Sequence, residues 1–264
     1  TAFPFSKIAL QHVDPLTLAV ARVVGGAILM LIIGVAKGLQ IPTSWREWGL
    51  YIILGMTGNF VYQVVFNQGL LTIPAATSSI IMALTPMTTA LMALVVYKDF
   101  MRPIGWLFTI TAFAGVAIII LWKGPINVPM GAFWTLFGMI LFAIYNIVNR
   151  GLSLKGHDSI TVATWSMFTG AIMALPFVSQ SVATIAAAPP IAWLAIIYLA
   201  CFSSALGFVF WSYALEHAEH VSDVTNFMYL SPLVAAIVAA ILIGEIPDLG
   251  LYIGAPIILC SLYM

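Results

Sequence analysis

Apolar residues run through the chain in long, uninterrupted stretches, and polar residues are confined to short breaks between them. A helix needs about 20 apolar residues to cross the hydrocarbon core of a bilayer, which is about 30 Å thick. The pattern therefore predicts an all-α integral membrane protein with ten transmembrane helices, of which the first and last are expected to be parts of longer helices. The ten segments are roughly 1–12, 15–37, 47–71, 74–97, 103–122, 131–150, 159–180, 191–215, 220–243 and 249–264.

A stretch in the fourth segment is repeated in the ninth. "SSIIMALTP" (78–86) and "VTNFMYLSP" (224–232) share their pattern of small, apolar and proline residues at an offset of 146. The matched pairs are Ser79 with Thr225, Met82 with Met228 and Pro86 with Pro232. One shared proline would be weak evidence, because membrane helices often contain proline. The agreement of several residue types in one register indicates an internal repeat.

A second pair of segments supports the repeat. Residues 13–34 parallel 157–177 at an offset of 144, with Asp14 matching Asp158 and Gly26 matching Gly170. The chain then divides into two five-helix units, 1–123 and 130–264. Five is an odd number, so the second unit must enter the membrane from the opposite side. Such inverted repeats are typical of secondary transporters, in which the substrate binds near the bilayer midplane where the repeats meet.

Composition agrees with a membrane protein. Hydrophobic residues make up 62% of the chain and charged residues 7%, with a mean hydropathy of +1.10, whereas a soluble domain is about 25% charged. The bilayer is therefore an expected partner, and the net charge of zero gives no reason to expect nucleic acid. Cys201 and Cys260 lie inside apolar runs, which favours neither a disulfide nor a metal site. No G-x-x-x-x-G-K motif is present to drive transport by nucleotide hydrolysis, and no cofactor is expected.

Basic residues predict the orientation. With the N-terminus in the cytoplasm, six Lys and Arg residues fall in inner connections and only Lys123 in an outer one. Positive residues favour the cytoplasmic side. We expect a multi-pass protein of a bacterial inner membrane with both termini cytoplasmic. The inner residues are Lys37, Arg46, Lys98, Arg102, Arg150 and Lys155.

Several motifs resemble one family over essentially the whole chain. "FPFSKIAL", "DPLTLAVARVVGGAILML", the "LTP" stretch with the "YKD" that follows it, and "SDVTNFMYLSPLVAAIVAAILIGE" are similar to the EamA-type branch of the drug/metabolite transporter superfamily. The resemblance implies ten helices in two inverted repeats and a small-molecule substrate in a central cavity. It also implies peripheral fifth and tenth helices, which would support the bundle or form a homodimer. Lys98-Asp99, where the family usually has Gly-Glu, and Cys260 depart from the pattern away from the cavity.

Lys7 and Arg22 are the charged candidates inside the membrane. Either could bind a substrate carboxylate, since ionisable groups inside a membrane are often functional. The alternative is that Arg22 hydrogen-bonds to backbone carbonyls or packs against a neighbouring helix, while Lys7 extends toward the interface. No Asp or Glu falls at mid-span, so nothing matches the buried Glu with which small multidrug proteins of the same superfamily exchange protons for organic cations.

Uncharged polar and aromatic side chains offer a larger set of candidates. Asn59, Tyr62 and Phe66 should share one helical face, and similar faces occur in the other segments. These residues would line an aromatic cavity with amide and hydroxyl anchors; the alternative is that they join helices together. The candidate contacts are Asn59, Tyr62, Gln63, Ser79, Met82, Tyr145, Asn146, Asn149, Trp165, Ser204, Trp211, Thr225, Asn226, Met228 and Tyr229.

Pro86 and Pro232 stand near mid-helix at matched places. Each removes a backbone hydrogen bond, so each is either a hinge for alternating access or a fixed kink. In "LEHAEHVSD" (215–223), the spacing of His and acidic residues suggests a metal site, but we favour an acidic loop that caps the ninth helix, with Asp223 or Ser222 near its N-terminus.

Together these features favour a secondary transporter for a small, mostly neutral metabolite such as an amino acid, working by alternating access, most simply as an exporter. No catalytic residue is predicted. The alternatives are a membrane-embedded enzyme acting on a lipid-like substrate, multidrug efflux by the same fold, and a structural protein without transport. A structural role would leave the inverted repeat unexplained.

Overall fold

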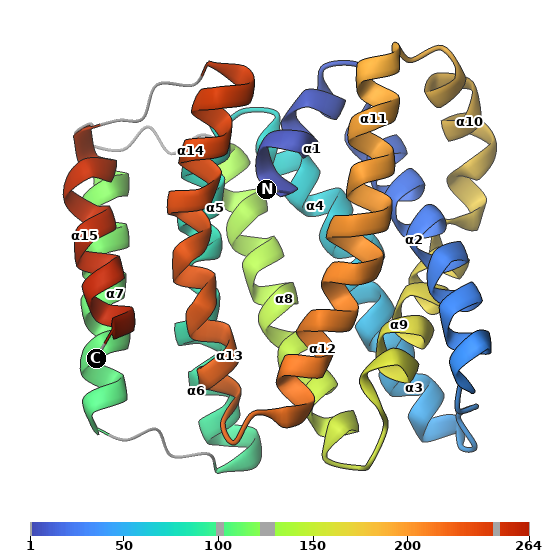
Figure 1. Cartoon of the computed structure of the whole chain (residues 1–264), viewed down its shortest axis with the longest axis horizontal. Coiled ribbons are helices and arrows are strands. Elements are labelled where there is room, and N and C mark those ends of the chain that lie inside the picture. Colours follow the sequence, from blue (N-terminus) through green and yellow to red (C-terminus); the bar gives the residue numbers. More distant parts are fainter. Residues whose placement is uncertain (1, 99–102, 122–129, 245–248, 264) are drawn as a thin grey trace.

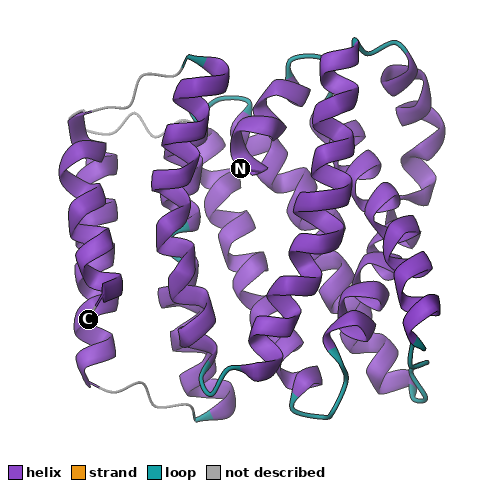
Figure 2. Ribbon diagram, viewed as in Figure 1, coloured by secondary structure: helices purple, strands orange, loops and turns teal. Residues whose placement is uncertain are grey.

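The structure, a computed structural model, describes residues 2–98, 103–121, 130–244 and 249–263. These residues are helical almost throughout, and no strand occurs among them (Figures 1 and 2). The prediction of an all-α protein is therefore confirmed. The predicted boundary between the repeats, 123–130, lies almost entirely outside the described ranges. Asp99 and Glu245 also lie outside them.

Seven helical spans within the described ranges are long and apolar enough to cross a membrane. The expected count of ten transmembrane helices stays a prediction. The seven spans are Pro15–Lys37, Trp45–Leu70, Thr77–Tyr97, Met130–Ser153, Ser159–Ala186, Pro190–His217 and Val221–Leu242.

Short irregular turns divide these spans into smaller elements. In chain order the elements are α1 (Ala2–Leu10), α2 (Pro15–Lys37), α3 (Trp45–Leu54), η1 (Gly55–Asn59), α4 (Phe60–Leu70), α5 (Ala75–Met82), α6 (Thr85–Tyr97), α7 (Pro103–Leu121), α8 (Met130–Ser153), α9 (Ser159–Ala174), η2 (Leu175–Phe177), α10 (Val178–Ala186), α11 (Pro190–Tyr198), η3 (Leu199–Leu206), α12 (Gly207–His217), α13 (Val221–Thr225), η4 (Asn226–Leu230), α14 (Ser231–Ile243) and α15 (Leu249–Tyr263).

Two aspartates that the sequence pairs begin two helices in the same way. The Asp14 carboxylate accepts two backbone N–H groups of α2 at 3.0 Å, and Asp158 accepts the N–H of Thr161 in α9 at 2.9 Å. Side-chain caps of this kind satisfy N–H groups that have no partner inside the helix. Partial burial raises the pKa of Asp14, these hydrogen bonds lower it, and the net shift is downward. In Figure 1, α2 runs from the upper to the lower end of the bundle and α9 runs the other way.

Irregular turns also occur at matched places. η1 and η3 are both π-helical, and they begin 144 residues apart. The predicted fourth helix is interrupted between α5 and α6, and the predicted ninth contains the 3₁₀ turn η4. Pro86 and Pro232 lie in the first turns of α6 and α14, just after these interruptions. A proline there does not remove a needed hydrogen bond, because first-turn N–H groups have no helical partner.

Glycines let two helix pairs approach closely in the interior. A Cβ at Gly69 of α4 would lie 2.3 Å from the Thr135 hydroxyl of α8, and one at Gly131 would lie 2.5 Å from the Gly69 carbonyl. At the second crossing, a Cβ at Gly55 of η1 would lie 2.6 Å from the backbone nitrogen of Gly170 in α9. Small residues are the usual means of helix contact in a membrane, where apolar burial against lipid gains little.

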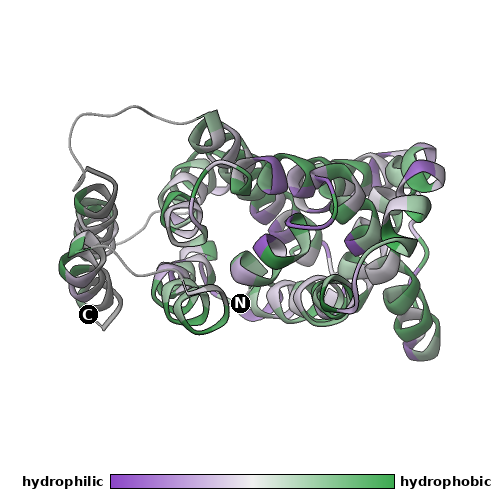
Figure 3. Cartoon of the chain, turned by 90° about the horizontal axis from the view of Figure 1, so that it is seen from above, coloured by the Kyte–Doolittle hydropathy of each residue, from purple (hydrophilic) through white to green (hydrophobic). Residues whose placement is uncertain are grey.

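The helices α7 and α15 pack against each other. Viewed from above, in Figure 3, they stand to one side of the remaining helices. This placement agrees with the peripheral fifth and tenth helices that the family resemblance implies. The buried polar residues of the core lie mainly on the other elements.

The crossing of α4 and α8 generates a test. We expect Gly69→Ala to lower the free energy of unfolding by about 1–3 kcal/mol, as overpacking of a tight interior typically does. Gly138→Ala on α8 is the matched control, because its Cβ would meet Val65 at 3.7 Å, an ordinary contact. Thermal unfolding in detergent measures both variants, and equal stability of the two would contradict the close approach.

Candidate functional site

Five aromatic residues meet in the interior around Phe142 of α8, and we call them the aromatic cluster. The Phe142 ring centroid lies 5.2 Å from Tyr62, 5.5 Å from Tyr145, 6.0 Å from Trp211 and 6.3 Å from Phe208. Tyr62 comes from α4, and Trp211 and Phe208 come from α12. Rings at these separations attract one another in addition to burying apolar surface. The aromatic cluster therefore links the two halves of the chain.

An apolar extension continues from the aromatic cluster toward α5 and η4. Phe66 stacks on Tyr62 with a centroid distance of 5.7 Å and contacts Phe3 of α1 edge-on at 5.1 Å. Met82 is buried beside Phe66, and the partly buried Met228 packs against the same group. The matched methionines of the fourth and ninth segments therefore pack against the same apolar group. Whether they contact a substrate stays a prediction.

Amide side chains of α8 connect the aromatic cluster to other helices. The Trp211 indole donates to the Asn146 side-chain oxygen at 2.8 Å, and the Asn146 amide donates to the Thr89 hydroxyl of α6 at 3.4 Å. One turn along α8, the Asn149 amide donates to the Tyr145 hydroxyl at 3.0 Å. A polar layer shared by α6, α8 and α12 therefore borders the rings.

Several buried polar oxygens have no hydrogen-bond partner within the described ranges. They include the side-chain oxygens of Gln63 on α4, Asn149 on α8 and Thr225 on α13. Buried polar atoms are nearly always paired, so each exception requires an explanation. All three residues were predicted as substrate contacts, and an unpaired acceptor of this kind is suited to a donor group on a ligand.

Arg22 is buried between α1, α2 and η3. Its guanidinium donates to the hydroxyls of Ser6 at 3.1 Å and of Ser203 and Ser204 at 3.4 Å each. The alternative that Arg22 bonds to neighbouring helices is therefore realised, although its partners are hydroxyls rather than backbone carbonyls. Lys7 does not extend freely toward the interface, because its ammonium donates to the Ile73 carbonyl at 3.3 Å.

Asn59 does not share a face with Tyr62 and Phe66 as expected. Its β-carbon lies against Gly170 of α9, and its amide donates back to the Leu54 carbonyl at 3.5 Å. Asn59 closes the π-helical turn η1. The i, i+3, i+7 rule assumes 3.6 residues per turn, and the wider turn of a π-helix breaks that spacing.

Trp165 lies outside the aromatic cluster. Its indole donates to the Gln40 carbonyl at 2.7 Å, and its ring meets Trp48 at 5.0 Å. A surface cleft of about 430 Å³ lies close by, between α3 and α9. The residues that line it are Thr43, Ser44, Trp45, Trp48, Phe168 and Ile172. Trp165 therefore belongs to an outer aromatic group near one end of the bundle.

The remaining candidates lie in less connected places. Ser79 is fully buried in α5, and Asn226 and Tyr229 lie in the 3₁₀ turn η4, where only Tyr229 is buried. In the 215–223 stretch the expected cap is present, since the Asp223 carboxylate accepts the His220 N–H at 3.0 Å.

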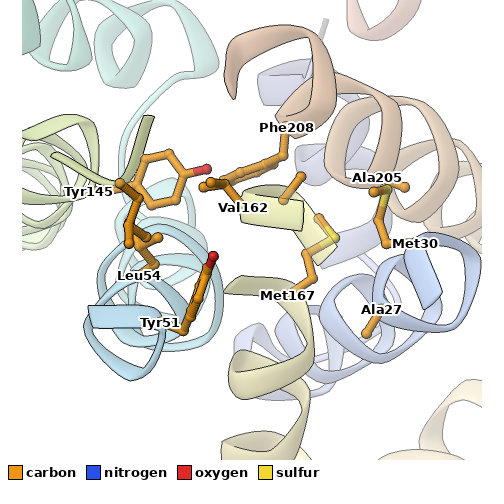
Figure 4. Packing of buried hydrophobic residues seen from close by; sticks show 11 residues of the cluster. Ala27, Met30, Tyr51, Leu54, Tyr145, Val162, Met167, Ala205 and Phe208 are labelled. Atoms are coloured by element: carbon orange, nitrogen blue, oxygen red, sulfur yellow. The ribbon is translucent and has the colours of Figure 1, made fainter. Parts of the chain in front are cut away.

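Some residues of the site were not predicted from the sequence. Phe208 lies edge-on to Tyr145 at 5.3 Å, as the close view in Figure 4 shows, yet it reads as an ordinary apolar residue. Ser6 and Ser203 were also missed. The adjacent serines in "CFSSALGF" (201–208) were a usable signal, because two hydroxyls in an apolar run need polar partners.

A helical bundle with a buried polar and aromatic interior, within spans of membrane length, is the architecture of a multi-pass membrane transporter. The sequence profile of the EamA-like transporter family matches residues 1–121 and 129–264. The chain belongs to this family, a branch of the drug/metabolite transporter superfamily, whose members are transporters and not enzymes.

Individual relatives agree with the family. A probable terminal-alkyne amino-acid exporter of Streptantibioticus cattleyicolor is 29% identical over 247 residues, which are 94% of this chain and 82% of the relative. An uncharacterized transporter of Archaeoglobus fulgidus is 29% identical over 272 residues, which cover 100% of this chain and 91% of the relative. A crystal structure at 18% identity has the same fold, with a TM-score of 0.72 over 99% of this chain and 93% of its own.

The contact between Tyr145 and the π-helical turn η1 can be tested by a double-mutant cycle. A Cβ at Gly58 would lie 2.1 Å from the Tyr145 ring, so Gly58→Ala should cost about 1–3 kcal/mol of stability. In a Tyr145→Ala background the added methyl group has room, and the cost should largely vanish. Unfolding in mixed micelles measures the coupling energy; additive effects would show that the ring does not depend on Gly58.

Proposed function

We propose that this protein is a secondary transporter that exports a small, mostly neutral metabolite, such as an amino acid, by alternating access. The observation that carries the proposal is the aromatic cluster around Phe142, bordered by the amides of Asn146 and Asn149. Sites for small molecules typically combine apolar and aromatic walls with a few polar anchors. The name of the Streptantibioticus relative, a probable exporter of an amino acid, supports this substrate class.

The proposed architecture is ten helices in two inverted five-helix repeats, 1–123 and 130–264. Three observations support it: α2 and α9 run in opposite directions, the π-helical turns η1 and η3 recur at the offset of the sequence repeat, and the family profile matches two successive stretches. Inverted repeats supply two conformations of similar energy, open to opposite sides.

The interruptions beside Pro86 and Pro232 are the proposed hinges. Each proline follows a break in regular helical hydrogen bonding. A hinge needs only a few such residues to absorb a change in backbone angles. The first break directly follows Met82, and the second, η4, contains Met228. Bending at these breaks would therefore move both methionines relative to the aromatic cluster.

The proposed substrate contacts fall into three groups: the aromatic cluster with the two methionines, the amide and hydroxyl anchors, and the charged residues. An apolar part of the substrate would lie on the rings, and its polar end would reach the anchors. Outside the aromatic cluster and the two methionines, the proposed contacts are Lys7, Arg22, Asn59, Gln63, Ser79, Asn146, Asn149, Trp165, Ser204, Thr225, Asn226 and Tyr229.

A counterflow assay in proteoliposomes with a panel of radiolabelled amino acids tests the function. We expect uptake of at least one apolar amino acid, reduced about tenfold by Trp211→Ala, since the ring and its hydrogen bond to Asn146 would both be lost. Met228→Trp should block transport by filling space needed by the substrate, whereas Met228→Leu, which conserves volume, should change it less than about twofold.

Trp193→Ala is the matched control for the counterflow assay, because Trp193 lies on the outer surface of α11 and is 40% exposed. Transport by this variant should equal that of the unmodified protein. If Trp211→Ala and Met228→Trp fold and transport normally, the aromatic cluster is not on the substrate pathway and only serves to pack helices.

The proposed orientation places both termini in the cytoplasm of a bacterium, and α7 with α15 forms the contact of a homodimer. Single cysteines at Lys155 and Ala187, in a chain whose two natural cysteines are replaced, test the orientation. Both positions are exposed, one in the α8–α9 connection and the other in the α10–α11 connection, and these connections lie at opposite ends of the bundle (Figure 1). A membrane-impermeant thiol reagent should label Ala187→Cys in intact cells and Lys155→Cys only after lysis; the reverse pattern would invert the topology.

A further inference from the structure

Arg22 carries a positive charge that no carboxylate neutralises within the described part of the chain. Arg22 is 3% exposed, and the hydrogen-bond partners of its guanidinium are three serine hydroxyls. A guanidinium remains protonated at any physiological pH. A buried charge is costly unless it is paired with an opposite charge. The serines satisfy hydrogen bonds, but they supply no negative charge, so the site is electrostatically incomplete.

The three serines are arranged to complete an anion site. Ser6 comes from α1, while Ser203 and Ser204 are neighbours in η3, and all three hydroxyl oxygens accept from the guanidinium. A hydroxyl that accepts a hydrogen bond keeps its own proton available to donate. Arg22 uses one hydrogen bond to each serine and has five N–H donors in all. Unused guanidinium donors and serine protons are the groups that bind the two oxygens of a carboxylate.

The site borders the aromatic cluster. Ser6 follows Phe3 by one turn of α1, and Phe3 contacts Phe66, which stacks on Tyr62 of the aromatic cluster. On the other side, Ser204 stands one helical turn before Phe208, about 5–6 Å along the axis. A molecule with a negative group at Arg22 would therefore have its remaining part over the rings of the aromatic cluster.

We propose that Arg22, Ser6, Ser203 and Ser204 form a carboxylate subsite, and that the transported metabolites are carboxylates with an apolar tail that lies on the aromatic cluster. This inference rests on the proposed function and narrows its substrate class. A single guanidinium matches a singly charged group better than a phosphate dianion. It repels organic cations, and that repulsion disfavours multidrug efflux of amines through this site.

Four ligands with the same phenyl ring test the subsite: L-phenylalanine, 3-phenylpropionate, L-phenylalaninamide and 2-phenylethylamine. At a fixed ligand concentration, a ligand that binds the folded state more tightly raises the unfolding temperature further, because the stabilisation grows with the logarithm of concentration over Kd. The two acids should stabilise the purified protein, and the amide and the amine should bind at least about tenfold more weakly, as the loss of one charge-assisted hydrogen bond predicts.

Substitutions assign that preference to residues. Arg22→Gln should abolish the preference for acids, and Arg22→Lys should keep part of it, since the charge remains but the fork of donors is lost. Ser203→Ala should weaken acid binding several-fold. Arg150→Gln is the matched control. Like Arg22, Arg150 donates hydrogen bonds to neighbouring elements, here to the backbone carbonyls of Leu215, Glu216 and Glu219, but it lies outside the site. It should leave the preference unchanged.

The outcomes separate this inference from the proposed function. If counterflow carries L-phenylalanine and its amide equally well, the protein is a transporter but the carboxylate subsite is wrong. Stabilisation by the acids without any counterflow would support the subsite and contradict transport of amino acids. An Arg22→Gln variant that unfolds more easily but keeps the preference for acids would show that Arg22 only ties helices together. Failure of all four ligands to stabilise the protein would also overturn the subsite.

Discussion

The need to pair every buried polar group without the help of water governs this molecule. The bilayer core offers no hydrogen bonds, so backbone groups are satisfied within helices and polar side chains must find partners on neighbouring helices. Thr89, Asn146 and Trp211 do so in one chain of contacts across three helices. The interior is held together largely by such contacts and by ring packing, and its exceptions, the charge of Arg22 and a few unpaired oxygens, mark where a ligand would gain most.

Close backbone approach makes these pairings possible. Glycines bring α4 against α8, and η1 against α9, at distances that no side chain would allow. The ring of Tyr145 occupies the space that Gly58 leaves open, and from there it reaches both Phe142 and Asn149. At this crossing a small residue and a large ring are thus complementary, because the Tyr145 ring fills the space that Gly58 opens on the facing helix.

Much of this could be predicted from the sequence, and the failures have two physical causes. Hydropathy predicted the helical fold. The repeated register paired Asp14 with Asp158, which the structure shows capping two helices, and Met82 with Met228, which pack against the same apolar group. The face of Asn59 was wrong, because the prediction assumed regular helical spacing and η1 does not have it. Phe208 and Ser6 were missed, because their importance lies in contacts with residues distant in sequence. Periodicity describes one helix at a time and cannot show which helices meet.

The π-helical turns have a consequence for how the aromatic cluster is aligned. A π-turn contains about one residue more than an α-turn. The helices that contain η1 and η3 therefore each hold one residue more than a regular α-helix of the same length. Rewinding η1 or η3 as α-helix would turn everything beyond it by about 100° and shift it by about 1.5 Å. Tyr62 follows η1, and Phe208 and Trp211 follow η3. The directions in which Tyr62, Phe208 and Trp211 point are therefore determined by the extra residue in the π-helical turn that precedes them, and there is one such turn in each half of the chain.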